Sequence, residues 1–362
     1  MKILFFAHET TLSGAPIQLF HLVNWLKRKG WQVSVAIPKA EAAESGPLSS
    51  RLAQAGVSTF PILDLSVPPA MEELRHLCAR FDLVVANTLV MWAAVRAAHE
   101  AGVPAVWYIH ESLVAEQLIA AIPEIQSALE LADCLVLPTP RTAEIYARRI
   151  DRPITVIPYG IPVPNAPPGL TTSSIREREF LLLGSYEPRK GQDLFLRAIE
   201  ELDDSVRQRA RFFLAGRVLD RTFHEALLRE AAEMPNVEVR AALDHGEALQ
   251  AIARADVLVC ASRDETMPVA ILEAMGLGKM IISTRVGGVT EWLSDESNAL
   301  LVPSNDSRAL AMALRRTVEN GELVESLGKN AHQTFLAYFS IDQLGRSFVA
   351  LFREMAPHQR NP

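Results

Sequence analysis

The chain has 362 residues and a formal net charge of −7, with 49% hydrophobic and 22% charged residues. This length and composition are typical of an ordinary globular protein with two domains. The acidic balance argues against nucleic-acid binding, which usually requires a basic face. Of three widely spaced cysteines, Cys134 and Cys260 lie in apolar runs, which indicates buried thiols rather than disulfides or a zinc site.

Apolar runs in the chain are all far shorter than the length that crosses a bilayer. The opening M-K-I-L-F-F-A is too short for a signal peptide and favours a first strand. We therefore expect a cytoplasmic protein with no transmembrane segment. Peripheral contact with a membrane surface is compatible with the same features.

Strand-like apolar runs alternate with helical patterns along both halves, which is typical of parallel sheets built from βαβ units. In the first half the strands are predicted at residues 3–7, 32–37, 57–61, 83–86, 105–109, 134–137 and 155–157. In the second half they are predicted at residues 179–183, 211–215, 237–239, 257–260, 280–283 and 299–302.

Four prolines stand between residues 161 and 172, where they exclude a helix or a central strand. We therefore predict a linker at 164–178, between an N-terminal domain at 1–163 and a second domain at 179–338. The apolar-faced segment 341–354 predicts a final helix.

One stretch, residues 262–291, carries the strongest functional pattern. A short helix is predicted over 269–275, with Pro268 in its first turn and Thr266 as its cap. Glu265 would lie just outside this helix and Glu273 between one and two turns inside it. Both would then face the carboxyl end of a parallel sheet, where α/β proteins bind ligands and a helix start favours an anion.

With L-E-A-M-G inside it and V-G-G-V-T-E at its end, this stretch resembles the donor-site motif of the retaining glycosyltransferases of family 4. In that family the first glutamate touches the transferred sugar and the second holds the ribose hydroxyls of the nucleotide. The resemblance thereby assigns these roles to Glu265 and Glu273. The alternative is a solvated loop glutamate and a helix glutamate favoured by the dipole.

The resemblance also implies a fold and a division of labour. The fold is GT-B, an α/β class in which two Rossmann-like domains with parallel sheets face each other across a cleft. Domain 1–163 would serve the acceptor and domain 179–338 would bind the nucleotide-sugar donor. Residues 339–362 would form a helix that crosses back to the N-terminal domain.

A second motif, G-S-Y-E-P-R-K-G, follows the first strand of the second domain. The family places an arginine and a lysine here, against the donor diphosphate, whose growing negative charge a cation would stabilise. Lys190 matches the lysine, and Ser185 replaces the arginine. Arg189 is a nearby substitute, but adjacent residues at a helix start are expected to point differently. The alternative for Lys190 is an exposed lysine at a helix start.

Loops at the ends of first-domain strands supply further candidates. Gly14, before the first helix, can let the backbone approach a phosphate, or can be a simple turn glycine. His110 matches a family histidine that contacts the transferred sugar, although a lone histidine is often structural. Weaker acceptor-side candidates at strand ends are His8, Asn87 and Glu111.

Donor contacts are also implied for the main chain. The family holds the nucleobase partly by backbone near Leu243. Pro268 replaces a frequent glycine and has no N–H, which leaves the amides of Met267 and Val269. The implied donor set is Gly14, Ser185, Arg189, Lys190, Leu243, Glu265, Thr266, Met267, Pro268, Val269 and Glu273. The implied catalytic set is Glu265, His110 and Lys190.

The chain has no D-x-D pair of the kind that marks a metal-bound diphosphate, so we expect no metal and no cofactor beyond the nucleotide sugar. The resemblance implies a retaining hexosyltransferase that moves the sugar to the hydroxyl of a glycan, a lipid-linked acceptor or a small molecule, in polysaccharide or glycoconjugate synthesis. Two alternatives stay open. One is a nucleotide-sugar epimerase, which would need acid and base groups around the sugar ring. The other is a non-catalytic nucleotide-sugar-binding subunit, which the missing arginine at Ser185 favours.

Overall fold

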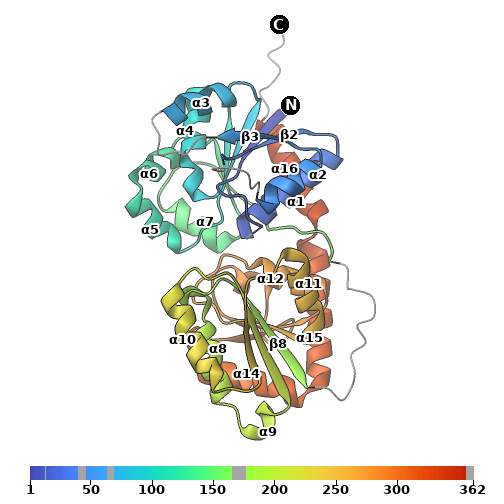
Figure 1. The fold of residues 1–362 in the computed structure, drawn as a ribbon. Helices are drawn as coiled ribbons and strands as arrows, with labels where there is room; N and C mark the ends of the chain where they lie inside the picture. The colour runs from blue at the N-terminus through green and yellow to red at the C-terminus, as the bar shows by residue number, and fades with distance from the viewer. Residues whose placement is uncertain (13, 40–45, 63–68, 165–176, 356–362) are drawn as a thin grey trace. The chain divides into compact units, whose positions relative to one another are not determined.

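The computed structural model describes residues 1–12, 14–39, 46–62, 69–164 and 177–355. The chain divides into two compact units (Figure 1). Unit 1 comprises Met1–Pro162 and Phe339–Pro362, and unit 2 comprises Val163–Tyr338. Most of the linker predicted at 164–178 lies outside the described residues.

Within its described residues, unit 1 is built on a seven-stranded parallel sheet in the order β3-β2-β1-β4-β5-β6-β7. The strands are β1 (Lys2–Phe6), β2 (Gln32–Pro38), β3 (Ser58–Ile62), β4 (Leu83–Asn87), β5 (Ala105–Tyr108), β6 (Cys134–Leu137) and β7 (Ile154–Val156). The helices are α1 (Gly14–Arg28), α2 (Pro47–Gln54), α3 (Pro69–Cys78), η1 (Leu89–Met91), α4 (Trp92–Glu100), α5 (Val114–Ala121), α6 (Pro123–Leu129), α7 (Pro140–Ala147) and α16 (Ile341–Met355).

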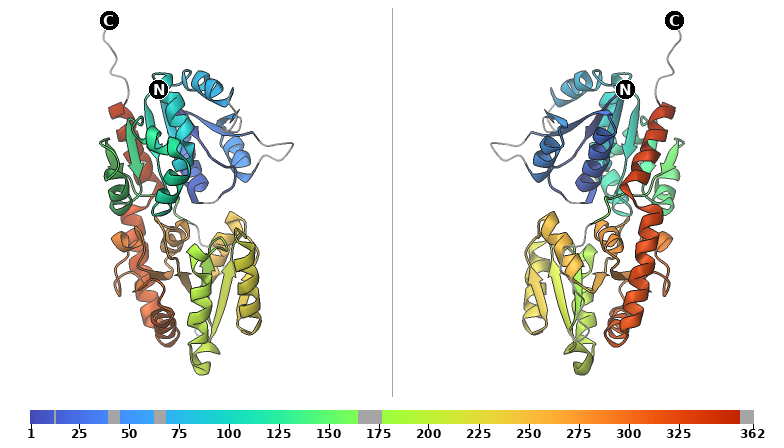
Figure 2. Two further views of the ribbon diagram at one scale, coloured as in Figure 1. Left: turned by 90° about the vertical axis from the view of Figure 1, so that its left-hand side faces the viewer. Right: turned by 90° about the vertical axis from the view of Figure 1, so that its right-hand side faces the viewer.

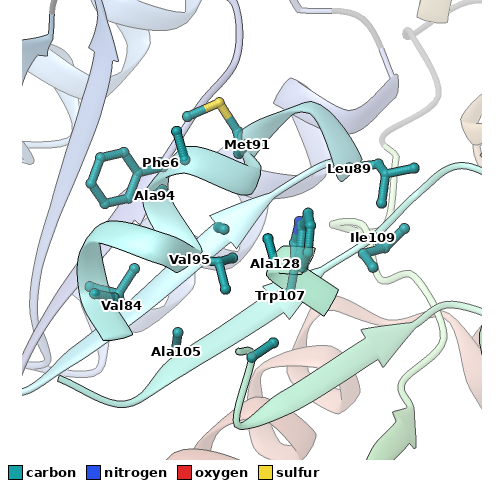
Figure 3. Close-up of a cluster of buried hydrophobic side chains, with 14 of the residues drawn as sticks. Phe6, Val84, Leu89, Met91, Ala94, Val95, Ala105, Trp107, Ile109 and Ala128 are labelled. Atoms are coloured by element: carbon teal, nitrogen blue, oxygen red, sulfur yellow. The ribbon is translucent and has the colours of Figure 1, made fainter. Parts of the chain in front are cut away.

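Successive residues of a strand point to opposite faces of the sheet, and helices cover both faces here. On one face Phe5 of β1 stacks edge-on against Phe352 of α16, with the ring centroids 6.4 Å apart. On the other face the residues beside Phe5 join a cluster with α3, α4 and α6. Figure 3 shows Val95 of α4 in this cluster with Val84 of β4 and Trp107 of β5. Strands covered on both faces are apolar throughout, which explains their sequences.

Within its described residues, unit 2 is built on a six-stranded parallel sheet in the order β10-β9-β8-β11-β12-β13. The strands are β8 (Arg178–Leu183), β9 (Ala210–Ala215), β10 (Val237–Arg240), β11 (Val257–Cys260), β12 (Met280–Thr284) and β13 (Leu300–Val302). The helices are η2 (Pro188–Lys190), α8 (Gln192–Glu200), α9 (Asp204–Arg207), α10 (Arg221–Ala232), α11 (His245–Arg254), α12 (Val269–Gly276), α13 (Val289–Trp292), α14 (Ser307–Glu319) and α15 (Gly321–Tyr338).

The predicted strands are all present among the described residues, and each differs from its prediction by at most one residue at an end. The prediction of two parallel α/β sheets is therefore confirmed. The final helix, predicted at 341–354, is α16, and it packs against α1 within unit 1 (Figure 2).

Each sheet has a point at which the strand order reverses. In unit 1 this point lies between β1 and β4, and in unit 2 it lies between β8 and β11. At such a point the loops that leave the carboxyl ends of two neighbouring strands diverge, which opens the crevice where α/β proteins bind ligands. The fold thus assigns one candidate region to each unit.

Candidate functional site

In unit 2 the loops that follow β8 and β11 touch backbone to backbone. The amide of Arg263 donates to the carbonyl oxygen of Arg189 at 2.8 Å. Gly191 has a φ of +69°, and a Cβ added to it would lie 2.0 Å from the carbonyl oxygen of Ala261. Only glycine fits this close approach. Gly191, which follows Lys190, therefore lets the two loops come together.

This approach places Lys190 against Glu265. The Lys190 ammonium pairs with Oε1 of Glu265, whose residue is only 7% exposed. The hydroxyl of Ser262 donates to the same oxygen at 3.2 Å. Lys190 is therefore not the exposed lysine of the alternative interpretation, because its side chain is 18% exposed and ion-paired.

Arg189 approaches the same carboxylate, with its Nη1 3.6 Å from Oε1 of Glu265. Its Nη2 lies 2.9 Å from Oε1 of Glu187, and Nη1 donates to the carbonyl of Asp264 at 3.2 Å. Burial opposes its charge, but Glu265 and Glu187 raise the pKa of Arg189 above its ordinary value. The prediction that Arg189 and Lys190 point differently is wrong. The single 3₁₀ turn of η2 ends at Lys190, with Gly191 as its C-cap, and both long side chains reach one oxygen.

Ser185 stands where the family has its arginine. Its hydroxyl donates to Oε1 of Glu187 at 2.6 Å, the oxygen that also holds Arg189. Although burial favours the protonated acid, Ser185 and Arg189 together lower the pKa of the Glu187 carboxyl. Ser185 therefore supports the carboxylate that orients Arg189.

Helix α12 begins at Val269, where its start is predicted, and ends at Gly276, one residue beyond the prediction. Pro268 is its N-cap, with φ −63° and ψ 128°, and makes no side-chain hydrogen bond to the helix. The prediction that Thr266 occupies the N-cap position and that Pro268 lies in the first turn is wrong, because Pro268 itself is the N-cap and the first turn begins at Val269. Met267 is buried, and Pro268 and Val269 are half-buried.

The Gly-Gly loop after β12 packs directly on the Glu265 loop. Gly287 has a φ of +48°, and a Cβ added to it would lie 1.4 Å from the carbonyl oxygen of Glu265. The amide of Gly288 donates to the carbonyl of Thr266 at 2.8 Å. The two glycines of the motif thus fix the backbone that carries Glu265.

Glu273 lies in the second turn of α12 and is 6% exposed. Its Oε1 lies 2.8 Å from Nε2 of His245, the first residue of α11. Leu243, implied in nucleobase binding, lies half-buried in the loop before α11. Sequence reasoning missed the imidazole, because 28 residues separate it from Glu273 and no spacing rule joins them.

In unit 1 two of the predicted residues, His110 and Asn87, form a hydrogen-bonded cluster at the strand ends with Tyr159, which is not among the predicted residues. Nε2 of His110 lies 2.7 Å from the amide oxygen of Asn87, and Nδ1 lies 2.8 Å from the hydroxyl of Tyr159. An amide oxygen only accepts, so Nε2 carries the hydrogen and Nδ1 accepts from Tyr159. Burial, followed by the nearby His8, lowers the pKa of His110 to about 3. The imidazole is therefore neutral at ordinary pH.

The other unit 1 candidates have local structural partners. Oε2 of Glu111 accepts from the amides of Leu89 and His110, each at 3.0 Å, which ties the loops after β4 and β5 together. Burial raises the pKa of Glu111, against the effect of these donors. Nε2 of His8 lies 3.6 Å from Oε1 of Glu9. Burial lowers the pKa of His8, although the charge of Glu9 opposes this.

Gly14 opens α1, and a Cβ added to it would meet nothing within 4 Å. Packing among the described residues therefore does not require glycine at this position. The open space beside it is what the prediction of a close ligand approach needs.

Among the described residues, no group of three or more His, Cys, Asp or Glu side chains could hold a metal ion. Within the same part of the chain, none of the helices combines the length and the apolar character needed to cross a membrane.

Two family models match the chain. The model described as Glycosyl transferases group 1 matches residues 173–334, and the model described as Glycosyltransferase Family 4 matches residues 12–163. The first match contains the Lys190, Glu265 and Glu273 region, and the second contains the His110 cluster.

Curated relatives match over part of their length. The alpha-D-kanosaminyltransferase of Streptomyces kanamyceticus is 25% identical over 48% of this chain and 45% of its own. A D-inositol 3-phosphate glycosyltransferase of Saccharomonospora viridis is 30% identical over 41% of this chain and 37% of its own. The chain thus spans about half the length or less of these two relatives.

Solved structures match over nearly the whole chain. Anabaena HepE, solved in complex with UDP-glucose, has a TM-score of 0.84 and 18% identity, and the match covers 98% of this chain and 100% of that one. The sucrose-phosphate synthase of Thermosynechococcus elongatus has a TM-score of 0.77 and 21% identity, with 98% and 99% covered. At these identities the likeness shows the fold, and it confirms the GT-B class.

Proposed function

The chain belongs to the family 4, group 1 glycosyltransferases, and on this premise we propose that it moves a sugar from a nucleoside-diphosphate sugar to an acceptor hydroxyl with retention of configuration. The observation that carries the proposal is the convergence of Lys190 and Arg189 on Glu265 at the switch point of unit 2. Two cations and a buried carboxylate at this place suit a sugar diphosphate, which presents a charged and a neutral part side by side.

Lys190 and Arg189 would hold the donor diphosphate. Without a ligand their charges are balanced by Glu265 and Glu187. An incoming diphosphate offers them a stronger anionic partner, and Glu265 is then free to accept a hydrogen bond from the sugar. As the bond from sugar to phosphate breaks, negative charge grows on the leaving oxygen, and preorganised cations lower the barrier.

Arg189 would supply the arginine that the family has at the position of Ser185. The supporting observation is the chain of contacts from Ser185 to Glu187 and from Glu187 to Arg189, at 2.6 and 2.9 Å. A guanidinium held in this way presents fixed N–H groups to a phosphate. The missing arginine therefore does not favour a binding subunit over an enzyme.

We propose a front-face transfer with no metal and no covalent sugar on the protein. The bond between the anomeric carbon and the phosphate oxygen breaks, the acceptor oxygen bonds to the same face, and the leaving phosphate takes the proton of the acceptor hydroxyl. Glu265 would hold the sugar and Glu273 the ribose. His110 would offer a neutral hydrogen bond to the sugar after releasing Asn87, because both its ring nitrogens are engaged.

The donor and the acceptor are proposed by class. A uridine nucleotide is the first donor to test, since the similar HepE structures hold UDP and UDP-glucose. A glycan, lipid-linked or polyol hydroxyl is the proposed acceptor, in polysaccharide or glycoconjugate synthesis. Relatives named for inositol 3-phosphate and colanic acid support this range.

The test is an incubation of the purified chain with UDP-, GDP-, ADP- and dTDP-sugars, with and without polyol and oligosaccharide acceptors, in chelator. We expect one donor to release its nucleoside diphosphate and to give a product whose anomeric NMR coupling matches that of the donor. An epimerised nucleotide sugar would instead support the epimerase. Donor binding without turnover for every acceptor would support the non-catalytic subunit.

A further inference from the structure

Glu273 has a partner that the donor-site motif does not contain. Among the described residues, the one hydrogen bond to its carboxylate comes from His245, at 2.8 Å between Nε2 and Oε1. Both side chains are largely buried, with 17% of His245 and 8% of Glu273 exposed. A carboxylate oxygen only accepts, so Nε2 of His245 carries the hydrogen and donates it.

The backbone of His245 is held in place independently of this contact. Asp244 and Glu247 form a reciprocal capping box, in which each side chain accepts from the other residue's amide at 2.8 Å. His245 is the first helical residue inside this box. A capping box fixes the start of a helix, so the imidazole extends from a rigid position.

The strand before α11 is also anchored. The hydroxyl of Tyr186 donates to the carbonyl of Arg240, the last residue of β10, at 2.7 Å. Tyr186 itself is fully buried in the loop that leads to Lys190. The segment that carries His245 is therefore tied to the segment that carries the two cations, within one unit.

We propose that His245 is a positioning residue for nucleotide binding, which holds the Glu273 carboxylate in the orientation that accepts the two ribose hydroxyls. The inference rests on the proposed function and adds a residue to it. With Oε1 fixed by His245, Oε2 and the remaining lone pair of Oε1 point in set directions. Without the imidazole, the glutamate side chain would sample several rotamers, and binding would have to order it.

The experiment compares His245→Ala, His245→Gln and His332→Ala by calorimetric titration. Glutamine offers an N–H near the position of Nε2, so it should rescue the function. His332 is the matched control, because its ring contacts the carbonyl of Met275 at 3.2 Å, on the same helix as Glu273 but away from its carboxylate. The probes are UDP, GDP and ADP, and the 2′,3′-dideoxy form of whichever binds the unaltered chain most tightly.

We expect His245→Ala to weaken ribonucleotide binding about tenfold, because binding would then have to order the Glu273 side chain. His245→Gln should recover most of this affinity, and His332→Ala should bind as the unaltered chain does. The dideoxy nucleotide should bind the unaltered chain and His245→Ala equally, since it has no hydroxyls for Glu273. In a transfer assay the donor KM should rise while kcat at saturation stays within about threefold.

Each other outcome overturns the inference in a recognisable way. Equal binding by His245→Ala, or equal weakening of the ribose and dideoxy probes, would show that His245 does not act through the ribose. If His245→Ala does not fold, His245→Asn gives the same comparison with a shorter side chain that cannot reach Glu273. If none of the three nucleotides binds the unaltered chain, the proposed function fails together with the inference.

Discussion

The two units carry the same kind of sheet and the same kind of switch point, but the chemistry at their strand ends is different. In unit 1, His110, Asn87 and Tyr159 form a neutral network of hydrogen bonds. In unit 2, Lys190 and Arg189 form ion pairs with buried or half-buried carboxylates. The fold therefore sets the place of each site, and the side chains on the loops set what it can bind.

The difference determines which interactions within each site a bound ligand has to replace. Ion pairs can exchange partners with little loss if the newcomer is itself an anion, as a diphosphate is. A neutral buried network gains nothing from charge, and it discriminates between hydroxyls by geometry. We therefore expect unit 2 to contribute binding energy and leaving-group stabilisation, and unit 1 to contribute selection of neutral groups.

The largest expected effect is at Lys190. Lys190→Ala should lower turnover by about 100-fold or more, the scale of losing one preorganised charge-stabilising donor. The structure adds a loss of stability, since the buried Glu265 would keep Arg189, at 3.6 Å, as its remaining cation. Steady-state transfer assays and thermal unfolding measure the two effects.

Arg189→Ala is the matched control, because it removes the more distant cation from the same carboxylate. Its effect on turnover should be smaller than that of Lys190→Ala. If Arg189→Ala proved the more damaging change, Arg189 would be the main diphosphate ligand and Lys190 a structural partner of Glu265.

The next effect is at Glu273. Glu273→Gln should weaken nucleoside diphosphate binding by roughly 1.5–3 kcal/mol, the scale of hydrogen bonds to a charged group. The change should be absent for a 2′,3′-dideoxy nucleotide, and calorimetric titration compares the two ligands. Undiminished binding of the ribonucleotide would contradict the assignment of Glu273 to the ribose.

Local pattern was enough to predict the strands, because buried parallel strands are short apolar runs whatever they pack against. The Glu265 loop and the position of Glu273 in its helix also followed from the motif. Side-chain pairing did not follow. The direction of Arg189 depends on a single 3₁₀ turn that Gly191 caps, and His245 meets Glu273 only through the packing of α11 on α12. Contacts of that kind belong to the folded backbone rather than to any window of sequence.

A third effect concerns pH and unit 1. In the folded chain the pKa of His110 is lowered to about 3, whereas in the unfolded chain it has the ordinary value of 6.5. As the pH falls below 6.5, His110 therefore takes up a proton in the unfolded chain but not in the folded chain. Stability that is present above pH 6.5 is then lost as the pH falls towards 3. The loss from this group is about 2 kcal/mol at pH 5.

His110→Gln has no such group, so its stability should fall less between pH 7.5 and 5.0. Glutamine can still donate to Asn87 and accept from Tyr159. His8, whose pKa is also lowered, acts in the same direction, and Glu111, whose pKa is raised, acts in the opposite one, but both are shared by the two proteins. Four of the five tryptophans lie in unit 1, so tryptophan fluorescence follows its unfolding. Parallel pH profiles for the two proteins would mean that His110 is protonated in the folded chain.

The smallest expected change in binding is an increase. From the motif alone, Glu265→Gln should leave the affinity for a free nucleoside diphosphate unchanged, because that ligand has no sugar to contact. The structure predicts otherwise, since Oε1 of Glu265 neutralises Lys190 and lies 3.6 Å from Arg189. Removing this charge leaves both cations to the diphosphate. After discounting for solvent screening, we expect binding about threefold tighter in low salt and less so in high salt.

Calorimetric titration of a nucleoside diphosphate at two salt concentrations measures this change, and transfer by the same variant should fall. Glu322→Gln is the matched control, because it removes an exposed negative charge away from Lys190 and Arg189. Glu322 follows Gly321 in α15, and Gly321 lies near Arg178, at the amino end of β8. It should not change the affinity. Weaker binding by Glu265→Gln would show that Glu265 holds Lys190 in position for the phosphate rather than competing for it. The charged cluster of unit 2 would then be as fixed in its pairing as the neutral cluster of unit 1.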